Sequence, residues 1–141
     1  MTNETLEQLS SILAEKSVRA VARDAALVQE IWNLAFAEAI AEDKRQGLSR
    51  WQLFEQGLLA AKSGEDAKAA FNETASQRLL MFWEDGASAW EARNAFALDA
   101  QTVDRIAQLQ EENLYLFNDE AGWTYILPRQ SVGPFFFRWE L

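Results

Sequence analysis

The C-terminal stretch 113–141 constrains the fold more than any other part of the chain, because it holds 8 of the 17 aromatic side chains (6 Trp, 2 Tyr and 9 Phe in all). Residues 113–118 and 123–127 are two runs rich in β-forming side chains on either side of an Asp-Glu-Ala-Gly turn. Residues 134–139 offer a third run. This pattern predicts an antiparallel β-hairpin or a three-stranded sheet at the C-terminus.

The preceding residues carry helix signals. Ser49 and Gln52 have the spacing of a capping box, in which two side chains satisfy exposed backbone N–H groups at a helix start, and Asp99 is a typical N-cap residue. The expected helices begin at residue 5 and continue at 24–45, 49–62, 65–83, 88–97 and 99–112. The predicted fold is α+β, a single domain over 1–141 in which a mostly helical bundle (3–112) is closed by a C-terminal antiparallel β-hairpin or three-stranded sheet (113–141).

The helix expected to begin at Asp24 and end at Arg45 carries two apolar stripes. One of them contains Leu27, Ile31 and Leu34, and it lies about 100° around the helix from the other. A helix that is apolar on two sides needs a cover on both, either as the central helix of a bundle or through contact with another protein. A homodimer through this helix is therefore one of the open interpretations.

The residue types present exclude many catalytic sites. The chain has no Cys and no His, which removes thiol nucleophiles, disulfides, Cys/His zinc sites and Ser-His-Asp triads. P-loop, Rossmann and nucleophile-elbow motifs are absent as well. Carboxylates remain: Glu38 and Glu42, at i and i+4 of an expected helix, could hold Mg²⁺ in a hydrolase, although such surface pairs are usually only solvated. The leading expectation is a non-enzymatic protein with no cofactor and no metal ion.

The charge balance bears on the kind of partner. The chain has 22 acidic and 13 basic residues and a formal charge of −9. An acidic surface disfavours contact with nucleic-acid phosphates, and it suits solubility or a basic partner. The N-terminus is acidic where a secretory signal would be basic, and no apolar run approaches the roughly 18 residues of a membrane span. We therefore expect a cytoplasmic protein that does not contact membranes.

Residues 86–106 have the spacing of a helix-turn-helix, with a capped first segment, a turn near Ala97, and Thr-Val two residues before Arg-Ile in the second segment. Together with the helix expected before it and the hairpin after it, this stretch resembles the winged-helix superfamily. The resemblance implies a DNA-binding regulator whose second helix enters the major groove, with Gln101, Thr102 and Arg105 facing DNA. The sequence departs from the family pattern at Arg93, where a small residue is usual, and at Ala97, where Gly is usual.

The aromatic C-terminus favours a different function. Both faces of its expected strands are apolar, so one face closes the core and the other is either buried too or exposed as a docking patch. The interpretation that we favour is a small acidic intracellular inhibitor or adaptor, of a kind found in viruses and mobile elements, which binds a partner protein's surface. The partner-binding residues that we expect are Tyr115, Phe117, Trp123, Tyr125, Phe136, Arg138 and Trp139.

Overall fold

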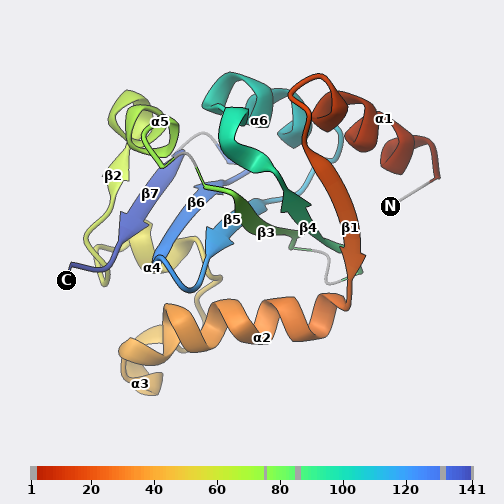
Figure 1. The fold of residues 1–141 in the computed structure, drawn as a ribbon. Coiled ribbons are helices and arrows are strands. Elements are labelled where there is room, and N and C mark those ends of the chain that lie inside the picture. Colours follow the sequence, from red (N-terminus) through yellow and green to blue (C-terminus); the bar gives the residue numbers. More distant parts are fainter. Residues whose placement is uncertain (1–2, 75, 85–86, 131–132, 141) are drawn as a thin grey trace.

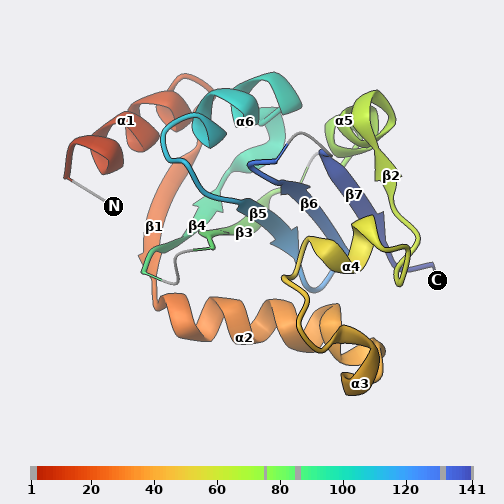
Figure 2. The ribbon, with the colours of Figure 1, turned by 180° about the vertical axis from the view of Figure 1, so that it is seen from behind.

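The computed structural model describes residues 3–74, 76–84, 87–130 and 133–140. Its centre is a seven-stranded antiparallel sheet in the order β1-β4-β3-β5-β6-β7-β2. The strands are β1 (Arg19–Arg23), β2 (Lys62–Ser63), β3 (Arg78–Trp83), β4 (Ala89–Arg93), β5 (Leu114–Asn118), β6 (Trp123–Leu127) and β7 (Phe135–Arg138). The sheet lies between two layers of helices (Figures 1 and 2).

One face of the sheet is covered by α1 (Asn3–Ala14), α5 (Gly64–Asn72) and α6 (Ala100–Ala107), and the other by α2 (Ala25–Ala35) and α4 (Gln52–Glu55). The short helix α3 (Glu42–Arg45) and the 3₁₀ turns η1 (Ala37–Ala39) and η2 (Ala95–Ala97) complete the described helices. Alternate residues of each central strand enter two separate cores. Leu116 of β5 packs in the α1/α5/α6 core, while its neighbours Tyr115 and Phe117 pack in the α2/α4 core.

Aromatic rings hold both layers to the sheet. Phe71 of α5 stacks on Tyr125 with 4.5 Å between ring centroids, and Phe82 stacks on Tyr115 of the neighbouring strand at 4.8 Å. Such pairs contribute about 0.5–1.5 kcal/mol beyond the burial of their area. Trp32 anchors α2, because its ring is fully buried and its Nε1 donates to Thr124 Oγ1 at 2.9 Å.

The predicted fold class is wrong in its main statement: the chain is α+β, but it is a three-layer protein with a large antiparallel sheet and not a mostly helical bundle. The C-terminal strands do lie within the predicted runs 113–118, 123–127 and 134–139, but they form the middle of the sheet and one side of it. The error lies in the residues that precede these strands. Residues 79–83 are buried on both faces of the sheet, so they form a continuous apolar run without the alternation that identifies a strand.

Several predicted helices are also corrected. The helix expected over 24–45 is divided into α2, η1 and α3, and the one expected over 49–62 is reduced to α4. The segment expected as a helix over 65–83 is α5 followed by β3. The helix start at Asp99 is confirmed, since its side chain accepts from Thr102 N at 2.8 Å. Residues 89–93 are β4, hydrogen-bonded between β1 and β3, so the first helix of the helix-turn-helix pattern does not form.

Candidate functional site

Most of the residues predicted to bind a partner lie in the interior. Five of them are 6% exposed or less, in two different cores. These five are Tyr115, Phe117, Trp123, Tyr125 and Phe136. Because helices cover both faces of the sheet, neither of its faces is left as the aromatic docking patch that the sequence suggested.

The hydroxyl of Tyr115 has a structural role. It accepts from Trp51 N at 3.2 Å and donates to Glu84 Oε1 at 2.8 Å. Burial, together with the neighbouring Glu84 carboxylate, raises the pKa of this phenol. Glu84 in turn accepts from Arg50, so the tyrosine is part of a network that ties α4 to the sheet.

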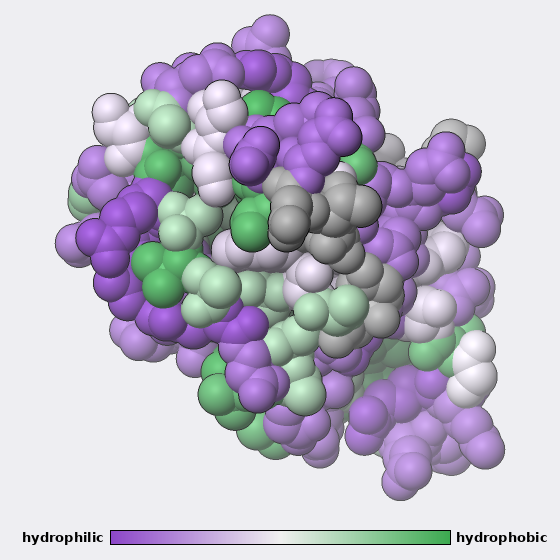
Figure 3. Space-filling view, turned by 90° about the vertical axis from the view of Figure 1, so that its right-hand side faces the viewer, coloured by the Kyte–Doolittle hydropathy of each residue, from purple (hydrophilic) through white to green (hydrophobic). Residues whose placement is uncertain are grey.

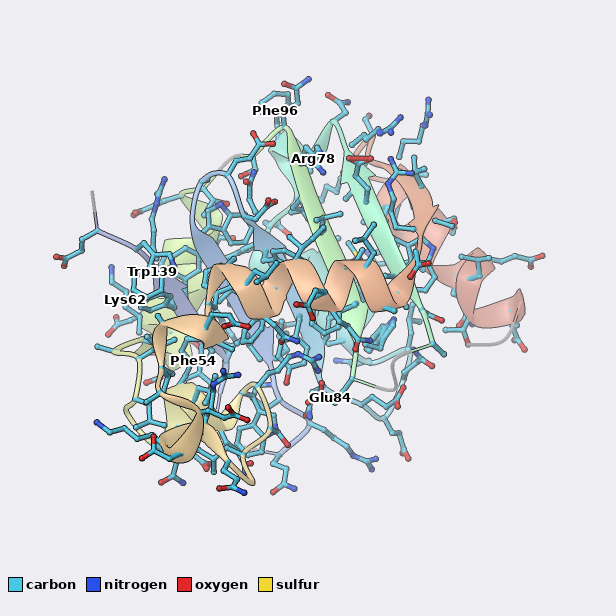
Figure 4. The ribbon with its side chains drawn as sticks, turned by 90° about the horizontal axis from the view of Figure 1, so that it is seen from below. Phe54, Lys62, Arg78, Glu84, Phe96 and Trp139 are labelled. Carbon is cyan, nitrogen blue, oxygen red and sulfur yellow. The ribbon has the colours of Figure 1, made fainter. Side chains whose placement is uncertain are left out.

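The last two predicted partner-binding residues, Arg138 and Trp139, are exposed. Trp139 Nε1 donates to Ala35 O at 2.8 Å, and its ring lies over Gly122. Trp139 therefore caps the C-terminal end of α2, where Figure 4 shows it.

The residues implied to face DNA do not form one reading surface. Thr102 is buried and Gln101 is exposed. Arg105 binds both carboxylate oxygens of Glu15, which directly follows α1, at 2.9 Å. A side chain committed to a bidentate ion pair has to break it before contacting a phosphate, and no described contact favours the DNA-binding alternative.

The predicted carboxylate pair is separated by a change of structure. Glu38 lies in η1 and Glu42 begins α3, so they do not share the helix face that i, i+4 spacing would give. Within the described ranges, no group of three or more Asp and Glu residues could hold a metal ion. In the same part of the chain, no helix is long and apolar enough to cross a membrane.

The outer face of α2 is the first candidate surface. Val28 and Trp32 point into the core, while Leu27 is 60% exposed and Leu34 is 62% exposed on the second stripe, about 100° around the helix. Ile31 lies between the two leucines and is half-buried. We call this Leu27–Ile31–Leu34 stripe the α2 ridge. Large side chains this exposed are unusual on a helix whose other face is well packed, so the ridge is a candidate docking surface.

The surroundings of the α2 ridge are acidic. At 3.6 residues per turn, Asp24 and Glu30 lie on either side of the ridge and Glu38 follows its C-terminal end, and all three are exposed. Asp24 is also the N-cap of α2, because its Oδ1 accepts from Leu27 N at 3.1 Å.

Figure 3 shows the side of the molecule that carries α1 and β1. Most of this surface is hydrophilic, and apolar residues form smaller areas among the hydrophilic ones.

The second candidate surface is a group of arginines around one buried carboxylate. Glu91 of β4 is 4% exposed, and its oxygens accept from Arg78 of β3, Arg23 of β1 and, at 2.8 Å, Arg93 of β4. Burial by itself would raise the pKa of Glu91, but hydrogen bonds from Arg78 and Arg93 and the charges of Arg78 and Arg23 outweigh it and lower the pKa to about 2. Glu91 is therefore ionised at any physiological pH.

Arg78, Arg93 and Glu91 border a hollow of about 580 Å³, which is also lined by Ser76, Gln77, Asn94, Asn118 and Glu120. Figure 4 shows why it is open: α2 crosses the sheet, and Arg78 lies beyond the helix, on the opposite side of it from Glu84. We call this site the arginine hollow.

A comparison with protein-family models matches residues 7–136 to the family described as "Domain of unknown function (DUF4275)". The chain belongs to this family. No curated protein and no solved structure matches it. Membership in DUF4275 assigns no activity to either candidate surface, so their chemistry has to be judged from the contacts described above.

Only one of the two surfaces of this DUF4275 member could be predicted from its sequence. The α2 ridge was visible as the second apolar stripe of the predicted helix. The arginine hollow was missed, because its two arginines come from different strands, β3 and β4, and Ala89–Arg93 was interpreted as a helix. The available signal was the Arg-x-Val-x-Arg alternation of β1, which is typical of a strand with one polar face.

Proposed function

We propose that this protein is a non-enzymatic protein-binding module of the cytoplasm, an inhibitor or adaptor that docks through the α2 ridge. The observation that carries the proposal is the exposure of Leu27 and Leu34, each about 60%, on the same side of one helix. An amphipathic helix with apolar anchors seven residues apart has the form that docks into an apolar groove on another protein.

The charges around the ridge support one kind of partner. Asp24, Glu30 and Glu38 are carboxylates beside or after the ridge, so the complementary surface is an apolar groove bordered by Lys and Arg side chains. A second copy of the chain fits less well. Antiparallel pairing of two α2 helices would bring Glu30 close to its own copy and Asp24 close to Glu38, where like charges repel.

The test starts with a photo-crosslinker at the exposed position Glu30, which identifies the neighbouring protein in cells. That protein is then purified, and its affinity is measured by calorimetry. Leu27→Ser combined with Leu34→Ser is expected to weaken binding about 30-fold or more, because burying the exposed parts of two leucines contributes about 2 kcal/mol. Phe96→Ser is the matched control, since Phe96 is 56% exposed on η2, away from the ridge.

Two further measurements decide the kind of partner. Affinity is expected to fall as salt is added, because the acidic border meets basic side chains. The proposal is overturned if the purified partner binds the double variant as tightly as the wild type. It is also overturned if the crosslink joins two copies of the chain and sedimentation shows a dimer that the leucine substitutions dissociate.

A further inference from the structure

Three arginines stand side by side across the sheet. The strand register places Arg93 of β4 directly opposite Arg19 of β1 on one side and directly opposite Arg78 of β3 on the other. Neighbouring strands are about 4.8 Å apart, and directly opposite side chains point to the same face. Like charges in such positions destabilise a sheet unless an anion compensates them. Repulsion between these arginines therefore lowers the stability of the sheet, and a bound anion would reduce that repulsion.

The chain itself compensates this row only in part. Glu91 accepts hydrogen bonds from Arg78 and Arg93 of this row and also from Arg23, so one buried carboxylate is shared by three guanidinium groups. Among the residues lining the hollow, the other carboxylate belongs to Glu120, which is 3.7 Å from Arg78 Nη1 and 82% exposed. A side chain this exposed gains little from an ion pair and leaves it easily.

We propose that the arginine hollow binds a phosphate group, with Arg93 and Arg78 as its main ligands. Near pH 7 phosphate carries close to two negative charges, one for each of these two arginines. Arg93 and Arg78 are 45% and 42% exposed, and each contacts Glu91 through Nε. Their terminal nitrogens carry further donors in the planar arrangement that suits phosphate oxygens.

The polar lining and the size of the hollow agree with this ligand. Ser76 and Gln77 supply neutral donors at its border, and a volume of about 580 Å³ admits a phosphomonoester as well as free phosphate. The site lies on the part of the sheet that α2 leaves open. The residues of the α2 ridge do not line it. Phosphate binding is thus independent of the proposed protein docking.

Calorimetry and thermal melts of the full chain test the proposal, with inorganic phosphate and AMP as probes and sodium chloride of equal ionic strength as the reference. Phosphate is expected to raise the melting temperature above that in chloride. Arg93→Gln is expected to weaken phosphate binding about 10- to 100-fold, because it removes a charge-assisted pair of hydrogen bonds. Glu91 keeps Arg23 and Arg78 in this variant, so the fold is retained.

Two variants provide controls. Glu120→Gln is expected to strengthen phosphate binding by removing the competing carboxylate. Arg129→Gln should leave it unchanged, since Arg129 is also an exposed arginine paired with an acid, Glu111, but lies outside the hollow. Tighter binding of AMP than of phosphate would identify a phosphomonoester as the natural ligand of the hollow. Equal or weaker binding of AMP would identify free phosphate as that ligand. Either no binding beyond the chloride reference, or equal loss in the Arg93 and Arg129 variants, would overturn the proposal.

Discussion

Replacing Glu91 with glutamine is expected to lower the free energy of unfolding by about 2–3 kcal/mol near neutral pH. The pKa of Glu91 is lowered to about 2, from about 4.3 for an unperturbed glutamate, and each pKa unit corresponds to about 1.36 kcal/mol. That difference gives about 3 kcal/mol. The arginines around Glu91 are between 37% and 45% exposed, and screening by solvent reduces the value somewhat.

The pH dependence has a definite sign, because the pKa of Glu91 is lower in the folded than in the unfolded chain. Above about pH 4.5 the carboxylate is ionised in both states, and its full contribution to stability is present. Between about pH 4.5 and pH 2 the unfolded chain binds a proton that the folded chain does not, so this contribution falls as the pH falls. Below about pH 2 both states are protonated and the contribution is lost.

Urea unfolding of the wild type and Glu91→Gln, measured from neutral pH downward in buffers without phosphate, tests this reasoning. The difference in unfolding free energy between the two proteins is expected to be constant above about pH 5 and to narrow towards zero as the pH approaches 2. Other carboxylates titrate in both proteins and cancel in the difference. Glu120→Gln is the control, because Glu120 is 82% exposed and contributes almost nothing.

Two results would refute this account of Glu91. One is an unfolding free energy of Glu91→Gln equal to that of the wild type at neutral pH, which would mean that the ion pairs between Glu91 and the arginines do not contribute to stability. The other is a difference that stays constant down to pH 2, which would place the loss in packing and not in charge.

Three further substitutions test the packing. Trp32→Phe removes the hydrogen bond to Thr124 Oγ1 and part of a buried ring, and should cost about 1–3 kcal/mol in urea unfolding. Gly122→Ala should cost about 1 kcal/mol or more, because the residue has a φ of +74° and its Cβ would lie 3.4 Å from the Trp139 ring. Tyr115→Phe should lower the melting temperature, since it leaves a buried backbone N–H and a carboxylate without their shared partner.

The sequence predicted local features of the fold far better than its overall arrangement. The C-terminal strands and the cap at Asp99 depend on neighbouring residues, and the structure has them where they were expected. Strand β3 was missed because burial on both faces removes its alternation, and β4 because Ala, Glu and Arg are good helix formers. In β4 the two neighbouring strands determine the conformation, and hydrogen bonds to them are invisible in a single sequence.

The two candidate surfaces also differ in whether neighbouring residues in the sequence determine them. The α2 ridge follows from spacing within one helix, so the sequence revealed it. The arginine hollow depends on the register that places Arg19, Arg93 and Arg78 in one row, although these residues are up to 74 positions apart in the chain. No local pattern specifies such a register, which is set by the pairing of whole strands.

The covering of the sheet on both faces explains why the docking surface is expected on a helix. The aromatic strands that the sequence offered as an interface fill two cores, so their buried side chains are not accessible to a partner. Docking is then left to the outer faces of helices and the two edges of the sheet. Edge strand β1 carries Arg19 and Arg23, and edge strand β2 carries Lys62, which are charges of the kind that discourage a further strand from pairing. The α2 ridge has no such charge within it, so apolar contact with a partner is most favourable there.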